Sequence, residues 1–248
     1  MQSSHPHHQI VVVGGSGDIG SAIVNRYISS GERVIIIDKN EPMRQASGSF
    51  MWMPADVMNL VDIRGIALEL TRRRIVVSHL ISLAGGALPG EHARDIMSVP
   101  DETIEDSISL NLTSHLWLVK SLMRDDPGNL GDRSVVFVSS VNALRGFGLT
   151  AYSAAKAGLL GATRELACAA WGERGVRVNA ILPGTVPTVR TLKQPKDFDA
   201  LLKTTTLGRF ATPTDIAAGC YFLTHMTTVV TGQGIVIDAG QSVKAPGG

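Results

Sequence analysis

Residues 10–20 read IVVVGGSGDIG, a short apolar run that leads directly into a glycine-rich turn. The run predicts a buried strand at residues 10–13, because a continuous apolar, β-branched stretch suits a strand covered on both faces. Apolar residues then recur at helical spacing as far as Gly31, so a helix should follow the turn. A second apolar run at residues 33–38 completes a strand–helix–strand unit.

The same alternation continues along the chain. Further strands are predicted between amphipathic helices, at residues 50–53, 79–83, 134–139, 176–181 and 234–237. This pattern is typical of an α/β fold, here a doubly wound parallel sheet of the Rossmann type with about seven strands and helices on both faces.

The domain organisation follows from what the chain lacks. No linker, repeat or change of composition interrupts the series, so residues 9–248 are predicted to form a single domain. We expect residues 1–8, which carry histidines at positions 5, 7 and 8, to be a flexible tail rather than a ligand set.

Composition excludes several classes of protein. The apolar content of 44% and the charged content of 18% are those of a packed globular chain, and a net charge of +1 provides no basic surface for nucleic acid. No run approaches the ~18 apolar residues that a membrane helix needs. Cys168 and Cys220 lie far apart in sequence, without metal-type spacing, so we expect no metal site, no disulfide and a cytoplasmic location.

The glycine turn has the spacing of a dinucleotide site. Residues 15–20 satisfy Gly-x-Gly-x-x-Gly between a strand and a helix, where glycines let backbone amides approach a pyrophosphate. Asp38 ends the second strand, where a carboxylate accepts hydrogen bonds from the adenosine ribose and repels a 2′-phosphate. This favours NAD over NADP, although Lys39 beside it would partly offset the repulsion. The alternative is that Asp38 only shapes a turn.

A second motif is Tyr152 followed four residues later by Lys156. This spacing puts both side chains on one helix face, and a cation a few ångströms away lowers a tyrosine pKa from ~10 by roughly 1 to 3 units. The tyrosine would then act as an acid or a base. A Tyr-x-x-x-Lys motif on its own is usually an ordinary surface feature. Here the glycine turn, and the serines just before Tyr152, favour a catalytic pair.

Two connections depart from regular alternation. Residues 85–100 and residues 184–207 both follow strands at the end of the sheet where open parallel sheets bind ligands, so they are candidate substrate walls. The alternative interpretation is that they are variable surface loops. Apolar and basic residues are mixed in the second connection and do not identify a substrate.

These separated motifs together resemble the short-chain dehydrogenase/reductase family over residues 10–238. The family pattern Thr-Gly-x-x-x-Gly-x-Gly falls on residues 13–20, with Val13 in place of threonine and Asp18 in place of the middle glycine. The family's Asn-Asn-Ala-Gly falls on residues 82–85, where Ser82 and Leu83 replace both asparagines.

The resemblance implies a set of site residues. The catalytic residues would be Asn111, Ser140, Tyr152 and Lys156, although the usual separation from the tyrosine would select Ser139 instead of Ser140. The cofactor would be NAD, with NADP less favoured. The residues that would bind it are Gly14, Ser16, Gly17, Ile19, Gly20, Asp38, Asp56, Val57, Ala84, Gly85, Tyr152, Lys156, Pro183, Gly184, Val186 and Thr188.

The resemblance also implies hydride transfer between the nicotinamide and a secondary alcohol or ketone, and we favour a small polyol, sugar or hydroxy compound. Two alternatives remain open: an NADP-linked 3-ketoacyl-type reductase, and a non-catalytic dinucleotide sensor or scaffold of the same fold. The expected partners are a small-molecule substrate and further copies of this chain in a dimer or tetramer, with neither nucleic acid nor membrane.

Overall fold

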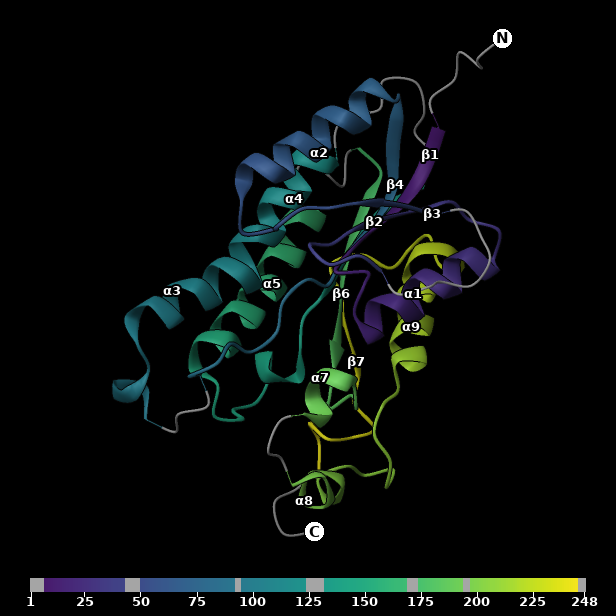
Figure 1. The fold of residues 1–248 in the computed structure, drawn as a ribbon. Helices are drawn as coiled ribbons and strands as arrows, with labels where there is room; N and C mark the ends of the chain where they lie inside the picture. The colour runs from purple at the N-terminus through teal and green to yellow at the C-terminus, as the bar shows by residue number, and fades with distance from the viewer. Residues whose placement is uncertain are drawn as a thin grey trace.

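The computed structural model describes residues 7–42, 50–91, 95–123, 132–168, 174–193 and 197–244. These residues form one sheet of seven parallel strands in the order β3-β2-β1-β4-β5-β6-β7 (Figure 1). The predicted fold class is confirmed. The strands are β1 (His7–Val13), β2 (Val34–Ile37), β3 (Phe50–Met53), β4 (Ile75–Ser82), β5 (Arg133–Val138), β6 (Val176–Pro183) and β7 (Gly234–Ile237).

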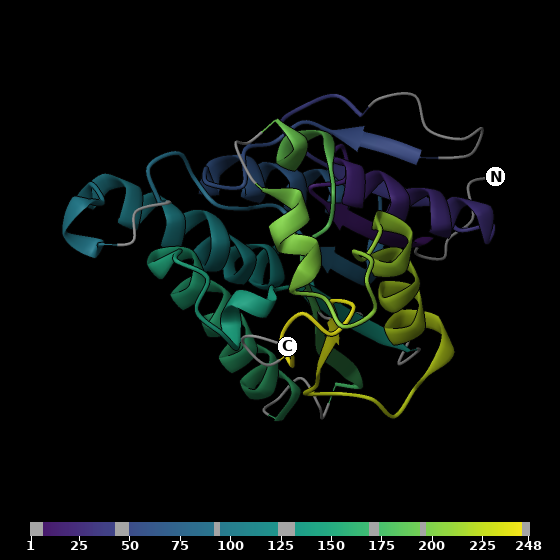
Figure 2. The ribbon, with the colours of Figure 1, turned by 90° about the horizontal axis from the view of Figure 1, so that it is seen from below.

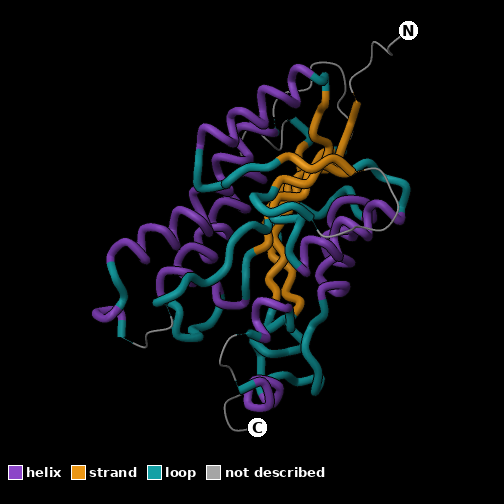
Figure 3. The backbone as a smooth tube through the Cα atoms, viewed as in Figure 1, coloured by secondary structure: helices purple, strands orange, loops and turns teal. Residues whose placement is uncertain are grey.

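Helices cover both faces of the sheet, so the strands lie in the middle layer (Figure 3). On one face lie α2 (Leu60–Arg72), α4 (Ser114–Leu122) and α5 (Thr150–Cys168), and on the other lie α1 (Asp18–Ser29) and α9 (Pro213–Tyr221). The other described helical segments are η1 (Ile96–Ser98), α3 (Asp101–Ile108), η2 (Ser109–Thr113), η3 (Val141–Ala143), α7 (Val189–Leu192), α8 (Phe198–Lys203) and η4 (Phe222–Met226).

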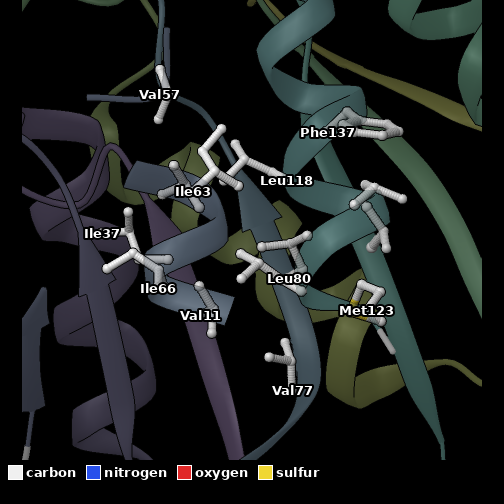
Figure 4. Close-up of a cluster of buried hydrophobic side chains, with 14 of the residues drawn as sticks. Val11, Ile37, Val57, Ile63, Ile66, Val77, Leu80, Leu118, Met123 and Phe137 are labelled. Carbon is white, nitrogen blue, oxygen red and sulfur yellow. The ribbon is translucent and has the colours of Figure 1, made fainter. Parts of the chain in front are cut away.

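The apolar strands supply two cores, one on each face. In β1, Val11 and Val13 pack towards α2 and α4, whereas Ile10 and Val12 pack towards α1 and α9. Successive side chains of a strand point to opposite faces, so a strand buried on both sides must be apolar throughout. Figure 4 shows part of the first core, where Val11 lies close to Ile66 of α2.

The sheet begins earlier in the chain than the sequence predicted. β1 starts at His7, which pairs with Ile75, and His8 pairs with Val76. The predicted tail is therefore wrong at residues 7 and 8, and residues 1–6 lie outside the described part. The reason is that β4 starts at Ile75, four residues before the predicted start, and provides backbone partners for these histidines.

The chain turns back at the centre of the sheet. From β1 it runs outward through β2 to β3, and it then returns to β4 on the other side of β1. In such sheets the crevice outside the carboxyl ends of the two strands at the reversal is where ligands bind. The two connections singled out in the sequence both follow strands at this end, and the second one carries α7 and α8. Among the described helices, none is long and apolar enough to cross a membrane.

Candidate active site

The glycine turn packs tightly against its neighbours and leaves space in front of α1. Gly14 has φ +85°, and a Cβ atom there would lie 2.8 Å from the Ala84 nitrogen. A Cβ atom at Gly20 would lie 2.1 Å from the Gly14 oxygen. At Gly17, just before α1, a Cβ atom would meet nothing within 4 Å. This arrangement fits a pyrophosphate cradle, because the backbone is closely held and the helix N-terminus is open.

Asp38 faces this turn. Its carboxylate accepts hydrogen bonds from the backbone N–H groups of Ser16 (3.1 Å) and Asn40 (2.9 Å). The Ser16 hydroxyl in turn donates to the Asn40 carbonyl at 2.7 Å. The acid that the sequence assigned to the adenosine ribose is thus held beside the glycine turn, while Lys39 is exposed.

Asp56 and Val57 follow β3 near the backbone of Asp38, because the Ala55 N–H donates to the Asp38 carbonyl at 3.4 Å. Val57 is buried, and the Asp56 carboxylate accepts a hydrogen bond from the Met58 N–H at 2.9 Å. These two predicted cofactor-binding residues therefore lie on the same side of the sheet end as Asp38.

Asp18, the unusual residue of the turn, points across to α7. It is the first residue of α1, and its carboxylate accepts a hydrogen bond from the Val189 N–H at 2.5 Å. The Asp18 carboxylate would be unfavourable beside a pyrophosphate, and here it is hydrogen-bonded to the backbone of α7 instead.

Ser82 has a partner that the sequence did not suggest. Its hydroxyl forms a hydrogen bond of 2.6 Å with Nδ1 of His115, a fully buried residue of α4. Burial, with a smaller contribution from Lys156, holds the pKa of His115 well below its usual range, so the ring is neutral. This pair links β4 to α4 at the position of the first missing asparagine.

Asn111 lies in η2, a π-helical turn, and is fully buried. Its side-chain oxygen accepts from the Gly86 N–H at 2.8 Å, and its amide donates to the carbonyls of Gly86 (3.2 Å) and Ser107 (3.1 Å). A Cβ atom at Gly85 would lie 2.5 Å from the Asn111 side-chain oxygen and 3.6 Å from Nζ of Lys156. Asn111, Gly85 and Lys156 therefore meet at one point, where only glycine fits between them.

The two candidate serines have different partners. The Ser139 hydroxyl donates to the backbone carbonyl of Lys156 in α5 at 2.8 Å, so it is hydrogen-bonded to the helix backbone. The Ser140 hydroxyl lies close enough to the Tyr152 side chain to lower the tyrosine pKa, and it donates to the Asn142 side-chain oxygen at 3.1 Å and accepts from the Asn142 N–H at 3.2 Å. Ser140 is therefore the serine that lies with the tyrosine, as preferred from the sequence around it.

Lys156 and Tyr152 share a face of α5, but the electrostatics differ from the expectation. Nζ of Lys156 lies 5.7 Å from the centre of the Tyr152 ring and donates to the Val138 carbonyl at 3.0 Å. Burial lowers the pKa of Lys156 to about 7. Burial also raises the pKa of Tyr152, against smaller lowering effects of Ser140 and Arg190. The predicted lowering of the tyrosine pKa by the lysine is not found, because low polarity disfavours both charged forms.

Two charged residues that the sequence did not assign to the site influence Tyr152. Arg190 of α7 lowers the tyrosine pKa, and Glu91 raises it. Glu91 is buried, and its carboxylate accepts from the Leu88 N–H at 2.5 Å. Both lie on connections proposed as substrate walls, but no local pattern distinguished them from ordinary loop charges.

The remaining predicted contacts lie where β6 leads into α7. β6 ends at Pro183, and a Cβ atom at Gly184 would lie 2.6 Å from Cβ of Asp238. Val186 is buried, and the Thr188 hydroxyl caps α7 by accepting from the Thr191 N–H at 3.1 Å. This segment thus runs from the sheet end to the helix that contacts Asp18.

Comparison with known proteins finds similar dehydrogenases and reductases. A sequence profile described as "Enoyl-(Acyl carrier protein) reductase" matches residues 14–242. An uncharacterised short-chain type dehydrogenase/reductase of Sinorhizobium fredii is 31% identical in an alignment of 261 positions that covers 98% of this chain but only 45% of that protein. The L-rhamnose-1-dehydrogenase of Scheffersomyces stipitis is 29% identical in an alignment of 252 positions that covers 95% of this chain and 96% of that one.

Solved structures share the fold. A short-chain dehydrogenase from Leptospira borgpetersenii, solved with bound NAD+, superposes with a TM-score of 0.84 and is 28% identical. The match covers 96% of this chain and 94% of that chain. The likeness therefore extends over the whole sheet and both helix layers.

Proposed function

Because this chain belongs to the short-chain dehydrogenase/reductase family, we propose that it moves a hydride between a nicotinamide dinucleotide and a carbon that bears a hydroxyl or keto oxygen. The chain is accordingly an oxidoreductase. The observation that carries the proposal is the meeting of Ser140, Tyr152, Lys156 and Asn111 at the carboxyl ends of the strands, beside the glycine turn.

Each of these residues has a role in handling the substrate oxygen and its proton. In the oxidation direction Tyr152 takes the substrate hydroxyl proton while its own phenol proton leaves towards Lys156, and Ser140 holds the substrate oxygen through a hydrogen bond. With a pKa of about 7, Lys156 can pass a proton onward near neutral pH, and Asn111 completes the relay beside it. When bound, the nicotinamide supplies the hydride acceptor or donor.

The cofactor that we propose is NAD rather than NADP. Asp38 supports this choice, because its carboxylate beside the glycine turn suits ribose hydroxyls and repels a 2′-phosphate. Gly14, Ser16, Gly17, Ile19 and Gly20 would hold the pyrophosphate. The ratio of kcat/KM with NAD to that with NADP tests this choice, and a ratio below one contradicts it.

We propose a cytoplasmic location, and the free thiols of Cys168 and Cys220 support this proposal.

The substrate that we propose is a small polyol or sugar, as the name of the relative from Scheffersomyces stipitis suggests. The name of the matching profile supports the alternative of an acyl thioester reductase. A panel of polyols, aldoses and β-ketoacyl thioesters, followed through the absorbance of reduced nicotinamide, separates the two. Turnover of thioesters alone would overturn the polyol assignment.

The catalytic assignment is tested by Tyr152→Phe, which removes the proton acceptor and keeps the ring. We expect kcat to fall at least about a hundredfold, since a positioned acid–base group contributes that much or more, while NADH binding persists. Tyr221→Phe is the matched control, because Tyr221 stacks on His225 in a separate cluster. Turnover by Tyr152→Phe at the level of this control would rule out the tyrosine as the proton acceptor.

A further inference from the structure

The short helix α7 is attached to the rest of the molecule mainly through polar contacts. It has four residues, none of which is buried, and Val189 and Leu192 are 59% and 61% exposed. Apolar packing therefore contributes little to its position. Figure 1 shows α7 beyond the lower end of β6, at the carboxyl ends of the strands.

One attachment is Asp18, at the position where the family pattern Thr-Gly-x-x-x-Gly-x-Gly has its middle glycine. Its carboxylate accepts the hydrogen bond from the Val189 N–H at 2.5 Å, so the first residue of α1 is joined to the first residue of α7. A glycine has no side chain to make this contact. The departure from the family pattern therefore has a structural consequence in this chain.

The other attachment is Arg190. Its guanidinium donates to the carbonyls of Gly85 (3.0 Å) and Ala87 (2.6 Å), which follow β4. Gly86 makes room for it, because a Cβ atom at Gly86 would lie 2.6 Å from an Arg190 nitrogen. The positive φ of Gly86, +125°, also favours glycine there.

The two attachments lie on opposite sides of the crevice. Asp18 follows β1 and Gly85 follows β4, and these neighbouring strands flank the point where the strand order reverses. α7 thus bridges the place where the dinucleotide would lie. Seen from below in Figure 2, the light green segment with α7 crosses the middle of the molecule.

We propose that Asp18 and Arg190 are positioning residues that form a clasp, defined by the contacts from Val189 to Asp18 and from Arg190 to Gly85 and Ala87, which holds α7 over the bound dinucleotide and slows its release. This inference rests on the proposed function, since it needs a nicotinamide dinucleotide in the crevice. Each attachment includes a charged partner, and hydrogen bonds of that kind are stronger than neutral ones.

The rate of NADH release tests the clasp, measured by stopped-flow fluorescence after mixing the NADH complex with excess NAD. We expect Asp18→Ala and Arg190→Met each to speed release about tenfold or more, the effect of losing one charge-assisted hydrogen bond. Asp18→Asn retains an acceptor and should have a smaller effect. Asp199→Asn and Lys193→Met are matched controls, because both residues are exposed and lie outside the clasp.

The double variant distinguishes a clasp from two unrelated effects. Because both attachments hold the same short helix, release of one side should largely release the other, so the combined effect should be smaller than the product of the single effects. If the release rate of the double variant rose by the full product of the two single effects, this result would contradict a shared clasp. Release rates equal to those of the controls would overturn the proposal.

Hydrogen exchange of the free protein provides a second readout that needs no cofactor. We expect the amides of residues 189–192 to exchange faster in Asp18→Ala than in Asp199→Asn, and unchanged exchange would also overturn the clasp. If the wild-type chain binds no NADH, the proposed function and the clasp both fail. If it binds NADH and all variants release it alike, only the clasp fails.

Discussion

At the scale of single residues, Lys156 shows how the site places a charge where the fold alone would not. Its ammonium group is buried, donates to one backbone carbonyl, that of Val138, and has a pKa lowered to about 7. An apolar side chain of similar length would satisfy the fold better at neutral pH. This cost to stability supports the role in chemistry at Tyr152 that we propose for Lys156.

Lys156→Met tests this conflict. Below about pH 7 the lysine is charged in both the folded and the unfolded chain, so the wild type carries the full penalty of burying the charge. Between pH 7 and ~10 the folded chain releases the proton while the unfolded chain keeps it, so wild-type stability rises with pH. The variant should be more stable than the wild type near pH 7, by on the order of a few kcal/mol, and the difference should shrink as the pH rises.

Urea unfolding at several pH values measures this difference in the free energy of unfolding. Lys120→Met is the control, because Lys120 lies exposed on α4 and its replacement should produce no such trend. If the wild type and Lys156→Met had parallel stability curves, the lysine would not be losing its proton on folding.

At the scale of elements, the contact between β1, the glycine turn and α1 determines whether a dinucleotide can be held. Gly20 and Gly65 both lie inside helices, but their surroundings differ. A Cβ atom at Gly20 would lie 2.1 Å from a backbone oxygen, whereas a Cβ atom at Gly65 would meet nothing within 4 Å. Alanine normally stabilises a helix relative to glycine. Replacement of Gly65 therefore measures helix propensity alone, whereas replacement of Gly20 also measures the close packing of the glycine turn.

We expect Gly65→Ala to raise the free energy of unfolding by ~0.5 to 1 kcal/mol. Gly20→Ala should lower it by about 2 kcal/mol or more, because backbone atoms must move apart, and it should weaken NADH binding. Chemical denaturation and NADH titration measure both effects. Equal stability changes in the two variants would show that the turn can relax around a methyl group.

The elements also show what the sequence could predict. Apolar runs located all of the described strands, but the start of β4 at Ile75 was missed because Ser78 interrupts the apolar pattern just before the predicted strand. In the structure Ser78 donates to the Gln9 carbonyl and His79 pairs with Ser134, partners 69 and 55 residues away. A polar residue inside a strand can be recognised as buried only when such distant partners are known.

The site was predictable to a similar extent. Tyr152 and Lys156 share one helix, and the turn and Asp38 share one strand–helix–strand unit, so their spacing was visible in the sequence. His115, Glu91 and Arg190 influence the site from three other segments, and only the packing of those segments brings them there. The pKa of Tyr152 could not be predicted for the same reason, since burial dominates it.

At the scale of the whole molecule, one edge of the sheet carries an apolar surface. β7 is the last strand of the sheet, and Val236 on it is 39% exposed. A hollow of about 190 Å³ lies beside it, between β7 and α5. It is lined by Leu144, Leu160, Thr163, Arg164, Leu182, Gly232, Gly234 and Val236.

Exposed edge strands with apolar neighbours tend to pair with another chain. The predicted homo-oligomer would bury this face, with β7 and α5 of two copies in contact. Val236→Glu would place a charge in that contact, and an unpaired buried charge weakens association strongly. We therefore expect sedimentation velocity to show a dimer or tetramer for the wild type and a smaller species for the variant. Val229→Glu, at a residue that is 87% exposed and does not line the hollow, should leave the mass unchanged. A monomeric wild type, or equal masses for all three proteins, would exclude this face as the subunit contact.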